Sequence, residues 1–424
     1  MTRFPVRKSK QIITAALALL SIQFSSSVLA AQPEDPLNFV FGTDVRYEDN
    51  LFRVEEGTPL GDASKHDIAT TYSAGIKLDK LYSLQRFQVD ATVTENRYQE
   101  NDFLNWKGFN YRAAWLWSIT PRVKGTLLAT RNETLNNFGD FRRIDPNTGS
   151  TRNLSSIQTN ERREFTADVL LWGGWHVVGG VAEVESRNSQ SFNEVGDFTQ
   201  DSAEFGGRYV FPSGSEITLV HREATGDYNR GVDITRQLDT GYDQSETEAK
   251  LDWRITGKSR ITARVGYIDR EHDNFSLRDY NGMTGLLTWL WTPTGKLLVN
   301  TAISRNLYSF QESNAIGGGL FFANGYDYSY YVADTFTVSP LWAITDKTSL
   351  RFRYDWSDRD YRGELNPVGP TRRDIVQSMT LTAEWEAMRT LVISAVARRE
   401  DRNSDREGFD YEADSIGISA ELIF

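Results

Sequence analysis

The chain contains no cysteine and only four histidines among its 424 residues. The absence of cysteine excludes a disulfide scaffold, a thiolate metal site, a cysteine nucleophile and a lipid anchor on cysteine. Long hydrophobic runs are also missing, because the one apolar stretch, residues 12–22, is too short and too close to the N-terminus for a lasting transmembrane helix. A mean hydropathy of −0.49 likewise excludes a bundle of membrane-spanning helices.

Aromatic residues, in contrast, are plentiful for so polar a chain. They make up 12% of the residues, beside 25% charged residues. The strands of a transmembrane β-barrel carry apolar residues only at alternate positions, so half of every strand is polar. The composition therefore favours a transmembrane β-barrel.

The N-terminus has the three parts of a secretory signal peptide. A basic segment precedes the apolar stretch, and small residues follow it up to Ala30. The basic residues are Arg3, Arg7, Lys8 and Lys10. We expect a signal peptide over residues 1–30 and an outer-membrane barrel over residues 31–424. The formal net charge is −11 before this segment is removed, so the acidic mature chain is expected to repel nucleic acid.

Most of the chain from residue 37 onward alternates apolar and polar residues with a period of two. In one example, Leu350, Phe352 and Tyr354 alternate with Arg351 and Arg353. Successive side chains of a strand point to opposite faces, so each such run has one apolar and one charged face. The pattern predicts an all-β, antiparallel up-and-down barrel of about 18 strands, within 16–20. Its boundaries are blurred at residues 175–186 and 326–339.

The connections between these runs alternate between short and long. The short ones are rich in Pro, Gly and Ser and lie at residues 119–122, 173–174, 212–215, 256–259, 292–295 and 387–390. The long ones lie at residues 48–67, 131–158, 187–200, 223–243, 305–326, 357–373 and 399–411. Short periplasmic turns and longer extracellular loops are typical of outer-membrane barrels.

Nine of the eleven tryptophans lie within a few residues of a short connection. They are Trp115, Trp117, Trp172, Trp175, Trp253, Trp289, Trp291, Trp342 and Trp385. Indole rings favour the boundary between lipid tails and headgroups, so these residues are predicted to form a periplasmic aromatic girdle. The repeated Trp-Leu-Trp before Pro121 and Pro293 indicates repeated hairpin chemistry.

The last run, residues 415–424, alternates and ends on Phe424. A closing strand with a C-terminal aromatic residue resembles the signal that the barrel-assembly machinery of Gram-negative outer membranes recognises. Phe424 is therefore our candidate assembly signal.

The positions opposite the apolar ones are predicted to face a lumen wide enough for water. The candidates are Arg86, Asp90, Arg112, Asp168, Arg208, Lys250, Asp252, Arg254, Arg260, Arg264, Arg351, Arg353, Asp355 and Glu384. Two interpretations stay open. These charges contact a polar solute, or they pair across strands and only stabilise the wall. Arg351 and Glu384 lie near short turns of neighbouring strands and are expected to pair.

Signatures of catalysis and of cofactor or metal binding are missing from the sequence. No cofactor and no metal are expected, and the chain is predicted not to be an enzyme. The best catalytic candidate is the rim segment 269–273, in which Asp269 and His272 loosely resemble the Asp/His pair of an outer-membrane protease. Residues 145–149 resemble a calcium loop without its ligand spacing, and we interpret them as a turn.

The segment 42–53, Gly-Thr-Asp-Val-Arg-Tyr-Glu-Asp-Asn-Leu-Phe-Arg, is similar to the start of the mature barrel in one porin family. This family comprises putative β-barrel porins of the exopolysaccharide-operon type (EpsL-like, β-barrel porin 2). Residues 87–91 and 111–115 resemble a further passage of those proteins. The resemblance implies an outer-membrane protein made alongside polysaccharide polymerisation and export machinery, and it implies no catalytic residues.

The leading hypothesis is a passive outer-membrane channel that takes part in exopolysaccharide export. Its expected partners are outer-membrane lipid, the barrel-assembly machinery, polysaccharide export proteins and an exopolysaccharide. One alternative is a general diffusion porin for small solutes, with the connection 131–158 as the longest candidate for a constricting loop. Another is a hydrolase or binding barrel that acts at the rim.

Overall fold

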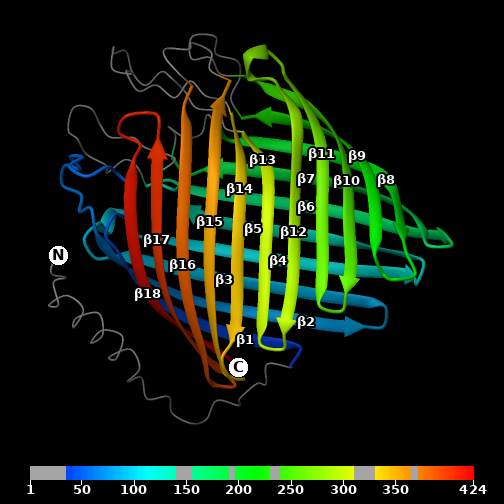
Figure 1. The fold of residues 1–424 in the computed structure, drawn as a ribbon, viewed down its shortest axis with the longest axis horizontal. Helices are drawn as coiled ribbons and strands as arrows, with labels where there is room; N and C mark the ends of the chain where they lie inside the picture. Colours follow the sequence, from blue (N-terminus) through cyan, green and yellow to red (C-terminus); the bar gives the residue numbers. More distant parts are fainter. Residues whose placement is uncertain (1–34, 140–154, 191–195, 230–238, 310–329, 364–370) are drawn as a thin grey trace.

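The fold is a closed, all-β, antiparallel barrel of 18 strands (Figure 1). The computed structural model describes residues 35–139, 155–190, 196–229, 239–309, 330–363 and 371–424. The predicted signal peptide and the segment 145–149 lie outside these residues. The strands are β1 (Leu37–Glu48), β2 (Asp67–Tyr82), β3 (Gln85–Tyr98), β4 (Trp106–Thr120), β5 (Val123–Leu135), β6 (Ile157–Trp172), β7 (Trp175–Asn188), β8 (Phe198–Val210), β9 (Glu216–Tyr228), β10 (Gly241–Thr256), β11 (Ser259–His272), β12 (Tyr280–Thr294), β13 (Leu297–Ser309), β14 (Tyr330–Ala343), β15 (Thr348–Arg362), β16 (Arg373–Met388), β17 (Leu391–Ser404) and β18 (Tyr411–Ile423).

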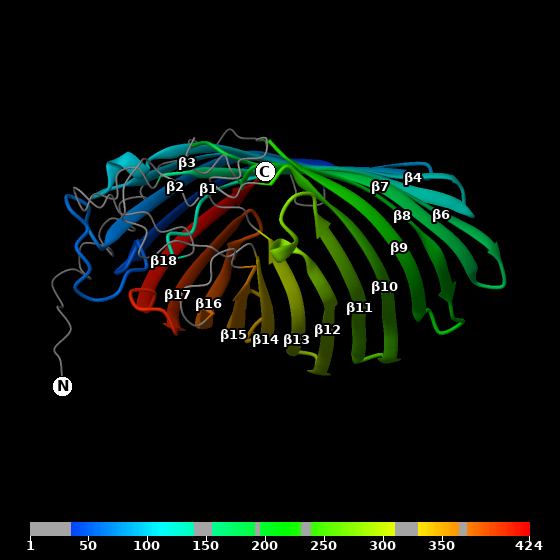
Figure 2. The ribbon, with the colours of Figure 1, turned by 90° about the horizontal axis from the view of Figure 1, so that it is seen from above.

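Each strand pairs with its neighbours in the chain, and β1 pairs with both β2 and β18. The closing seam runs from Val40 opposite Ile423 to Glu48 opposite Ser415. The strands of the two walls are tilted in opposite senses, so β10–β18 cross β2–β7 steeply when the barrel is viewed through its side (Figures 1 and 2). The predicted fold class is confirmed, and the blurred ranges correspond to β7 and β14.

The two ends of the barrel differ, as the alternating connections predicted. At one end, called the short-turn end below, tight turns join β2 to β3, β4 to β5 and so on to β16 and β17. Gly173 and Gly174 form one of these turns with φ of 55° and 89°, a conformation that glycine adopts without strain. The turns at residues 83–84 and 344–347 were not predicted. The opposite end, the long-loop end, carries every longer connection.

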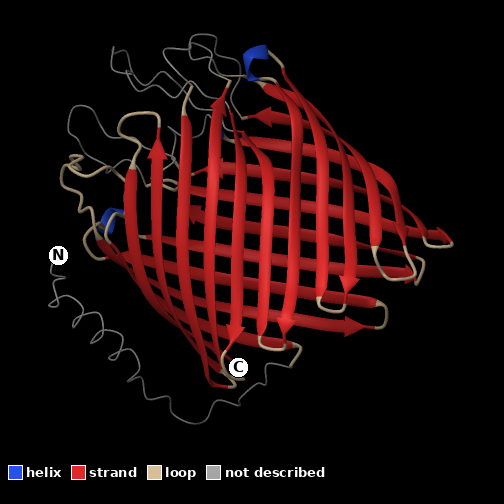
Figure 3. Ribbon diagram, in the orientation of Figure 1, coloured by secondary structure: helices blue, strands red, loops and turns tan. Residues whose placement is uncertain are grey.

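Helical structure in the described part of the chain is limited to two single turns at the long-loop end (Figure 3). They are η1 (Asp102–Leu104) and η4 (Ser276–Arg278). None of the helices in these residues is long and apolar enough to cross a membrane.

Buried aspartates tie the connections of the long-loop end together. The carboxylate of Asp67, at the start of β2, accepts hydrogen bonds from the backbone N–H groups of Gln99, Glu100 and Asn101 at 2.9–3.1 Å. Asp239 accepts in the same way from the loop that follows β11, where Asn274 donates through its backbone and its side chain. Beyond the strand ends the backbone N–H groups no longer have partners on a neighbouring strand, and these carboxylates accept hydrogen bonds from them instead. The connections at the mouth are therefore bonded to the ends of the barrel strands.

Candidate functional site

The two faces of the barrel wall carry different residues. Large apolar side chains are exposed on the outer face, where Phe87 stacks on Trp115 with ring centroids 6.0 Å apart and Trp117 stacks on Phe165 at 5.6 Å. The predicted lumen-lining residues occupy the alternate positions. For instance, Arg86 lies opposite Leu116, one position away from the Phe87–Trp115 pair. All fourteen candidates lie on this second face by their register.

Nine of the fourteen candidates form ion pairs within the wall. Arg86 pairs with Asp79 at 2.6 Å, and Arg353 pairs with Asp355 at 2.7 Å. The other six paired candidates are Asp168, Arg208, Lys250, Asp252, Arg260 and Arg264. Arg208 pairs with Asp168, Arg260 with Asp252, and both Lys250 and Arg264 with Glu248. The Arg86–Asp79 pair is exposed at both ends and contributes little stability, whereas Asp168 and Glu248 are largely buried in the wall, where their partners hold them.

The remaining five candidates have no side-chain hydrogen bond or ion pair among the described residues. They are Asp90, Arg112, Arg254, Arg351 and Glu384, and all five are exposed. The expected pair between Arg351 and Glu384 is not formed, although the register, with Arg351 opposite Thr382 and Glu384 opposite Ser349, makes the two residues diagonal neighbours on the inner face. Other diagonal neighbours of the wall do pair, as Arg260 and Asp252 do, so nearness to the same turns did not decide which charges meet.

A cavity of about 380 Å³ lies along the wall from β7 to β12. Its charged lining is mixed and includes Glu204, Arg208, Glu216, Lys250, Asp252 and Arg264. Beside it, Nδ1 of His176 lies 2.5 Å from Oδ1 of Asp168, which also pairs with Arg208. Both signs of charge are therefore presented to whatever enters this cavity.

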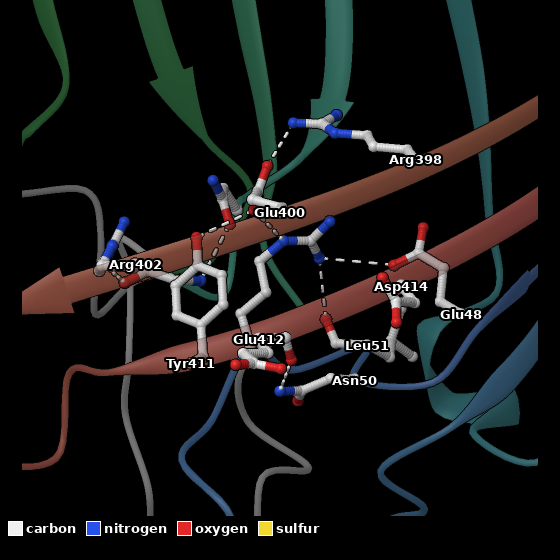
Figure 4. A network of polar contacts seen from close by, with 12 residues as sticks. Glu48, Asn50, Leu51, Arg398, Glu400, Arg402, Tyr411, Glu412 and Asp414 are labelled. Carbon is white, nitrogen blue, oxygen red and sulfur yellow. Dashed lines mark hydrogen bonds and ion pairs between the residues drawn. The ribbon is translucent and has the colours of Figure 1, made fainter. Parts of the chain in front are cut away.

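At the long-loop end, the segment after β1 turns back onto β17 and β18. Arg53 has a φ of 50°, in the left-handed region that non-glycine residues rarely adopt. Its Nε donates to Glu400 at 2.9 Å, and its Nη1 lies 3.4 Å from Glu48 and donates to the carbonyl of Leu51 at 3.1 Å. Figure 4 shows this network, with Tyr411 donating to the same Glu400 at 2.9 Å. The segment 42–53 thus ends in a side chain that bonds to Glu400 on β17, on the other side of the seam.

The carboxylates around Arg53 favour the charged form of its guanidinium. Burial opposes the charge of Arg53, but the neighbouring carboxylates of Glu48 and Glu400 outweigh burial and raise the pKa of Arg53. The guanidinium is therefore protonated wherever the barrel is folded, and both carboxylates are held in place by it.

Part of the connection after β5 crosses the mouth of the barrel. The ring of Phe138 packs on Phe52 with centroids 4.9 Å apart, and the carbonyl of Gly139 accepts a hydrogen bond from Nη1 of Arg402 at 2.5 Å. Arg402 belongs to β17, and five strands separate β17 from β5 around the ring. The predicted constricting loop therefore enters the mouth in its described part.

An apolar cluster accompanies this crossing. It contains the buried residues Leu51, Phe52, Val54, Leu60, Leu104 and Phe138, which come from three different connections. Buried apolar surface stabilises the packing of these connections against one another, so the long-loop end holds a small core of its own.

The rim residues proposed for catalysis do not converge. His272 lies opposite Tyr242, whereas Asp269 lies opposite Ser245, three positions away along β11. An odd separation puts the two side chains on opposite faces of the strand. Groups of three or more metal-ligating side chains are absent from the described part of the chain.

The tryptophans cluster at the short-turn end. Eight of the nine predicted girdle residues share the outer face with the exposed apolar residues, and Trp172 follows an irregularity at the end of β6. Phe424 extends the seam beyond β18. It exchanges backbone hydrogen bonds of 2.6 and 2.9 Å with Phe39 and stacks on Phe41 at 5.4 Å.

Comparison with known proteins gives a family match for the C-terminal part of the chain and a similar fold for the whole barrel. Residues 243–424, which reach from β10 to the end of the chain, match the family model described as putative beta-barrel porin 2. No curated protein sequence matches the chain.

Among solved structures, the barrel is similar to a BenF-like porin from Pseudomonas fluorescens Pf-5, with 12% identity, 93% of this chain and 100% of that chain covered, and a TM-score of 0.50. The barrel is also similar to OccK2 (OpdF) from Pseudomonas aeruginosa, with 11% identity, 93% of this chain and 100% of that chain covered, and a TM-score of 0.49. OccAB4 from Acinetobacter baumannii is 10% identical, with 92% of this chain and 99% of that chain covered and a TM-score of 0.48. At such low identity the likeness describes the fold alone.

Proposed function

Because residues 243–424 match the putative beta-barrel porin 2 family model and the chain folds as a closed barrel, we propose that it is an outer-membrane channel that passes a polar glycan during exopolysaccharide export. The coarser part, an outer-membrane porin-like channel, follows from the family and the closed barrel. The glycan is the proposed part. Export through a signal peptide at residues 1–30, and insertion guided by Phe424, belong to the same proposal.

The observation that carries the proposal is the set of five unpartnered charges on the inner face. Arg112, Arg254 and Arg351 each offer a planar fork of N–H donors, and Asp90 and Glu384 offer acceptors. Hydroxyl and carboxylate groups of a glycan fit such donors and acceptors. The nine paired charges contribute to the wall instead, so the unpartnered five are the residues available to a solute.

Conductance of the purified protein in planar bilayers tests this proposal. We expect a steady conductance that falls when an acidic polysaccharide is added on the short-turn side. Replacing Arg112, Arg254 and Arg351 together by Gln removes three positive charges and should shift the ion selectivity toward cations and weaken the block by the polysaccharide.

A matched control is the double variant Arg353→Gln and Asp355→Asn, which removes one wall pair without changing the net charge. It should leave selectivity and block unchanged. A barrel that conducts no ions, or a triple variant with wild-type selectivity, would contradict the proposed path.

The crossing of the mouth by the connection after β5 favours a second candidate, a diffusion porin for small solutes. A loop that narrows a pore gives a size limit without chemical selectivity. Swelling of proteoliposomes in neutral sugars of increasing size distinguishes the two. A sharp size limit with no effect of the acidic polysaccharide supports the diffusion porin.

A further inference from the structure

Four of the tight turns share one sequence pattern, Trp-x-x-Thr-x-Lys/Arg. The four copies are Trp-Ser-Ile-Thr-Pro-Arg at 117–122, Trp-Arg-Ile-Thr-Gly-Lys at 253–258, Trp-Thr-Pro-Thr-Gly-Lys at 291–296 and Trp-Ala-Ile-Thr-Asp-Lys at 342–347. They connect β4 to β5, β10 to β11, β12 to β13 and β14 to β15. The last three turns follow one another around the short-turn end.

The four copies also share a hydrogen bond. In each copy the threonine hydroxyl accepts from the backbone N–H of the cationic residue two positions later. The distances are 3.3 Å for Arg122, 3.2 Å for Lys258, 3.3 Å for Lys296 and 3.2 Å for Lys347. Such a contact is a local side-chain turn, and it fixes the direction in which the cation leaves the backbone.

Two of the lysines reach sideways to the next turn. Nζ of Lys258 donates to the carbonyl of Pro293 at 3.5 Å, and Nζ of Lys296 donates to the carbonyl of Ile344 at 3.2 Å. Each ammonium has three donors, so one bond to a carbonyl leaves two for another acceptor. The three lysines thereby form a continuous cationic arc along the turns between β10 and β15.

The tryptophan of each copy lies on the outer face of the barrel, five residues before the cation. Trp253, Trp291 and Trp342 are 50%, 39% and 49% exposed. Indole rings favour the boundary between lipid tails and headgroups, and cations just beyond that boundary meet the phosphates. The single carboxylate in the four copies is Asp346, beside Lys347, against the cations Arg122, Arg254, Lys258, Lys296 and Lys347, so the copies together carry a net positive charge.

We infer that the four turns are a repeated headgroup-binding module and that the Lys258–Lys296–Lys347 arc binds anionic phospholipids of the periplasmic leaflet. In this assignment the tryptophan sets the depth of the turn, the threonine orients the cation, and the ammonium holds a lipid phosphate. The module anchors one side of the barrel and is independent of the solute that passes through the lumen.

Native mass spectrometry of the detergent-purified barrel with added phosphatidylglycerol tests this inference. In the triple variant Lys258→Gln, Lys296→Gln and Lys347→Gln, the affinity for phosphatidylglycerol should fall by roughly fivefold per lysine at low salt, and the difference should shrink as salt is added. Binding of zwitterionic phosphatidylethanolamine should not change.

The matched control removes three cations at the long-loop end by Lys65→Gln, Arg97→Gln and Lys107→Gln, and it should retain the wild-type affinity. Equal losses in both triple variants would mean that only total charge matters and would overturn the assignment. So would undiminished binding in the lysine variant.

A second set, Thr256→Val, Thr294→Val and Thr345→Val, keeps every charge and removes only the orienting hydroxyls. We expect a smaller but selective loss of phosphatidylglycerol, with phosphatidylethanolamine unaffected. Wild-type binding in this set would show that the turn contact does not position the cations. A shift in gel mobility on heating verifies that each variant is folded.

Discussion

Arg53 combines an unfavourable backbone conformation with a densely bonded side chain. A left-handed conformation costs an ordinary residue roughly 1–2 kcal/mol relative to glycine, and yet arginine occupies this position with φ 50°. The contacts to Glu48, Glu400 and Leu51 explain how this is tolerated. The contacts of the side chain therefore account for an arginine at this position of the backbone.

We predict that Arg53→Ala destabilises the barrel more than Arg53→Gly does, by about 1 kcal/mol, because both lose the ion pairs but only glycine relieves the backbone. Urea unfolding followed by tryptophan fluorescence measures the difference, and Glu55→Ala, an exposed residue of the same loop, is the control. If the glycine variant is no more stable than the alanine variant, the left-handed backbone at position 53 does not strain a non-glycine residue.

The pH dependence of this anchor follows from the direction of its pKa. Because the pKa of Arg53 is raised on folding, its contribution to stability is fully present below the unfolded pKa and is lost only as pH rises through the still higher folded pKa. The destabilisation caused by Arg53→Ala should accordingly be the same at neutral and at moderately alkaline pH. A destabilisation by Arg53→Ala that is smaller at moderately alkaline pH than at neutral pH would contradict a raised pKa of Arg53 in the folded barrel.

At the scale of the element, the seam between β1 and β18 is where the two ends of the sheet meet. The sequence predicted a closing strand from its alternation, but not its partner or register. In the barrel, Phe424 adds a pair of backbone hydrogen bonds beyond the last seam pair and stacks on Phe41. Closing the sheet leaves no unpaired edge, which a barrel in lipid requires.

We predict that deleting Phe424 lowers the yield of folded barrel in the outer membrane, because the seam loses two hydrogen bonds and one ring contact. Phe424→Tyr keeps all three and should assemble normally. The fraction of protein that shows heat-modifiable gel mobility reports folding. Equal fractions for the deletion and the wild type would argue against a role of this residue in closure.

At the scale of the whole molecule, the mouth is shaped by contacts between distant parts of the chain. Gly139 and Arg402 are 263 residues apart, and their hydrogen bond links the connection after β5 to β17. Sequence alone identified the long connection between β5 and β6 as a candidate for constriction, because of its length. Its inward course depends on Phe52 and Arg402, which no local pattern relates to Phe138 and Gly139.

We predict that Arg402→Ala loosens this crossing and raises the conductance and its fluctuations in planar bilayers. Arg398→Ala is the matched control, because it removes an exposed arginine of the same strand that pairs with Glu400 and does not touch the crossing connection. A rise of equal size in both variants would mean that lost charge, and not the crossing, governs the conductance.

The sequence predicted the barrel from its alternation, its connections and its tryptophans, and it predicted about 18 strands, within 16–20. Alternation by itself determined the face of each charged candidate, because successive side chains of a strand point to opposite faces. Tertiary structure decided which charges are paired. Arg353 pairs with Asp355 on its own strand, whereas Arg351 and Glu384, although diagonal neighbours, do not pair. It also decided that Asp269 and His272 stay apart and that the mouth is crossed. Pairing between different strands and loops depends on the distance between them, and alternation along one strand carries no information about that distance.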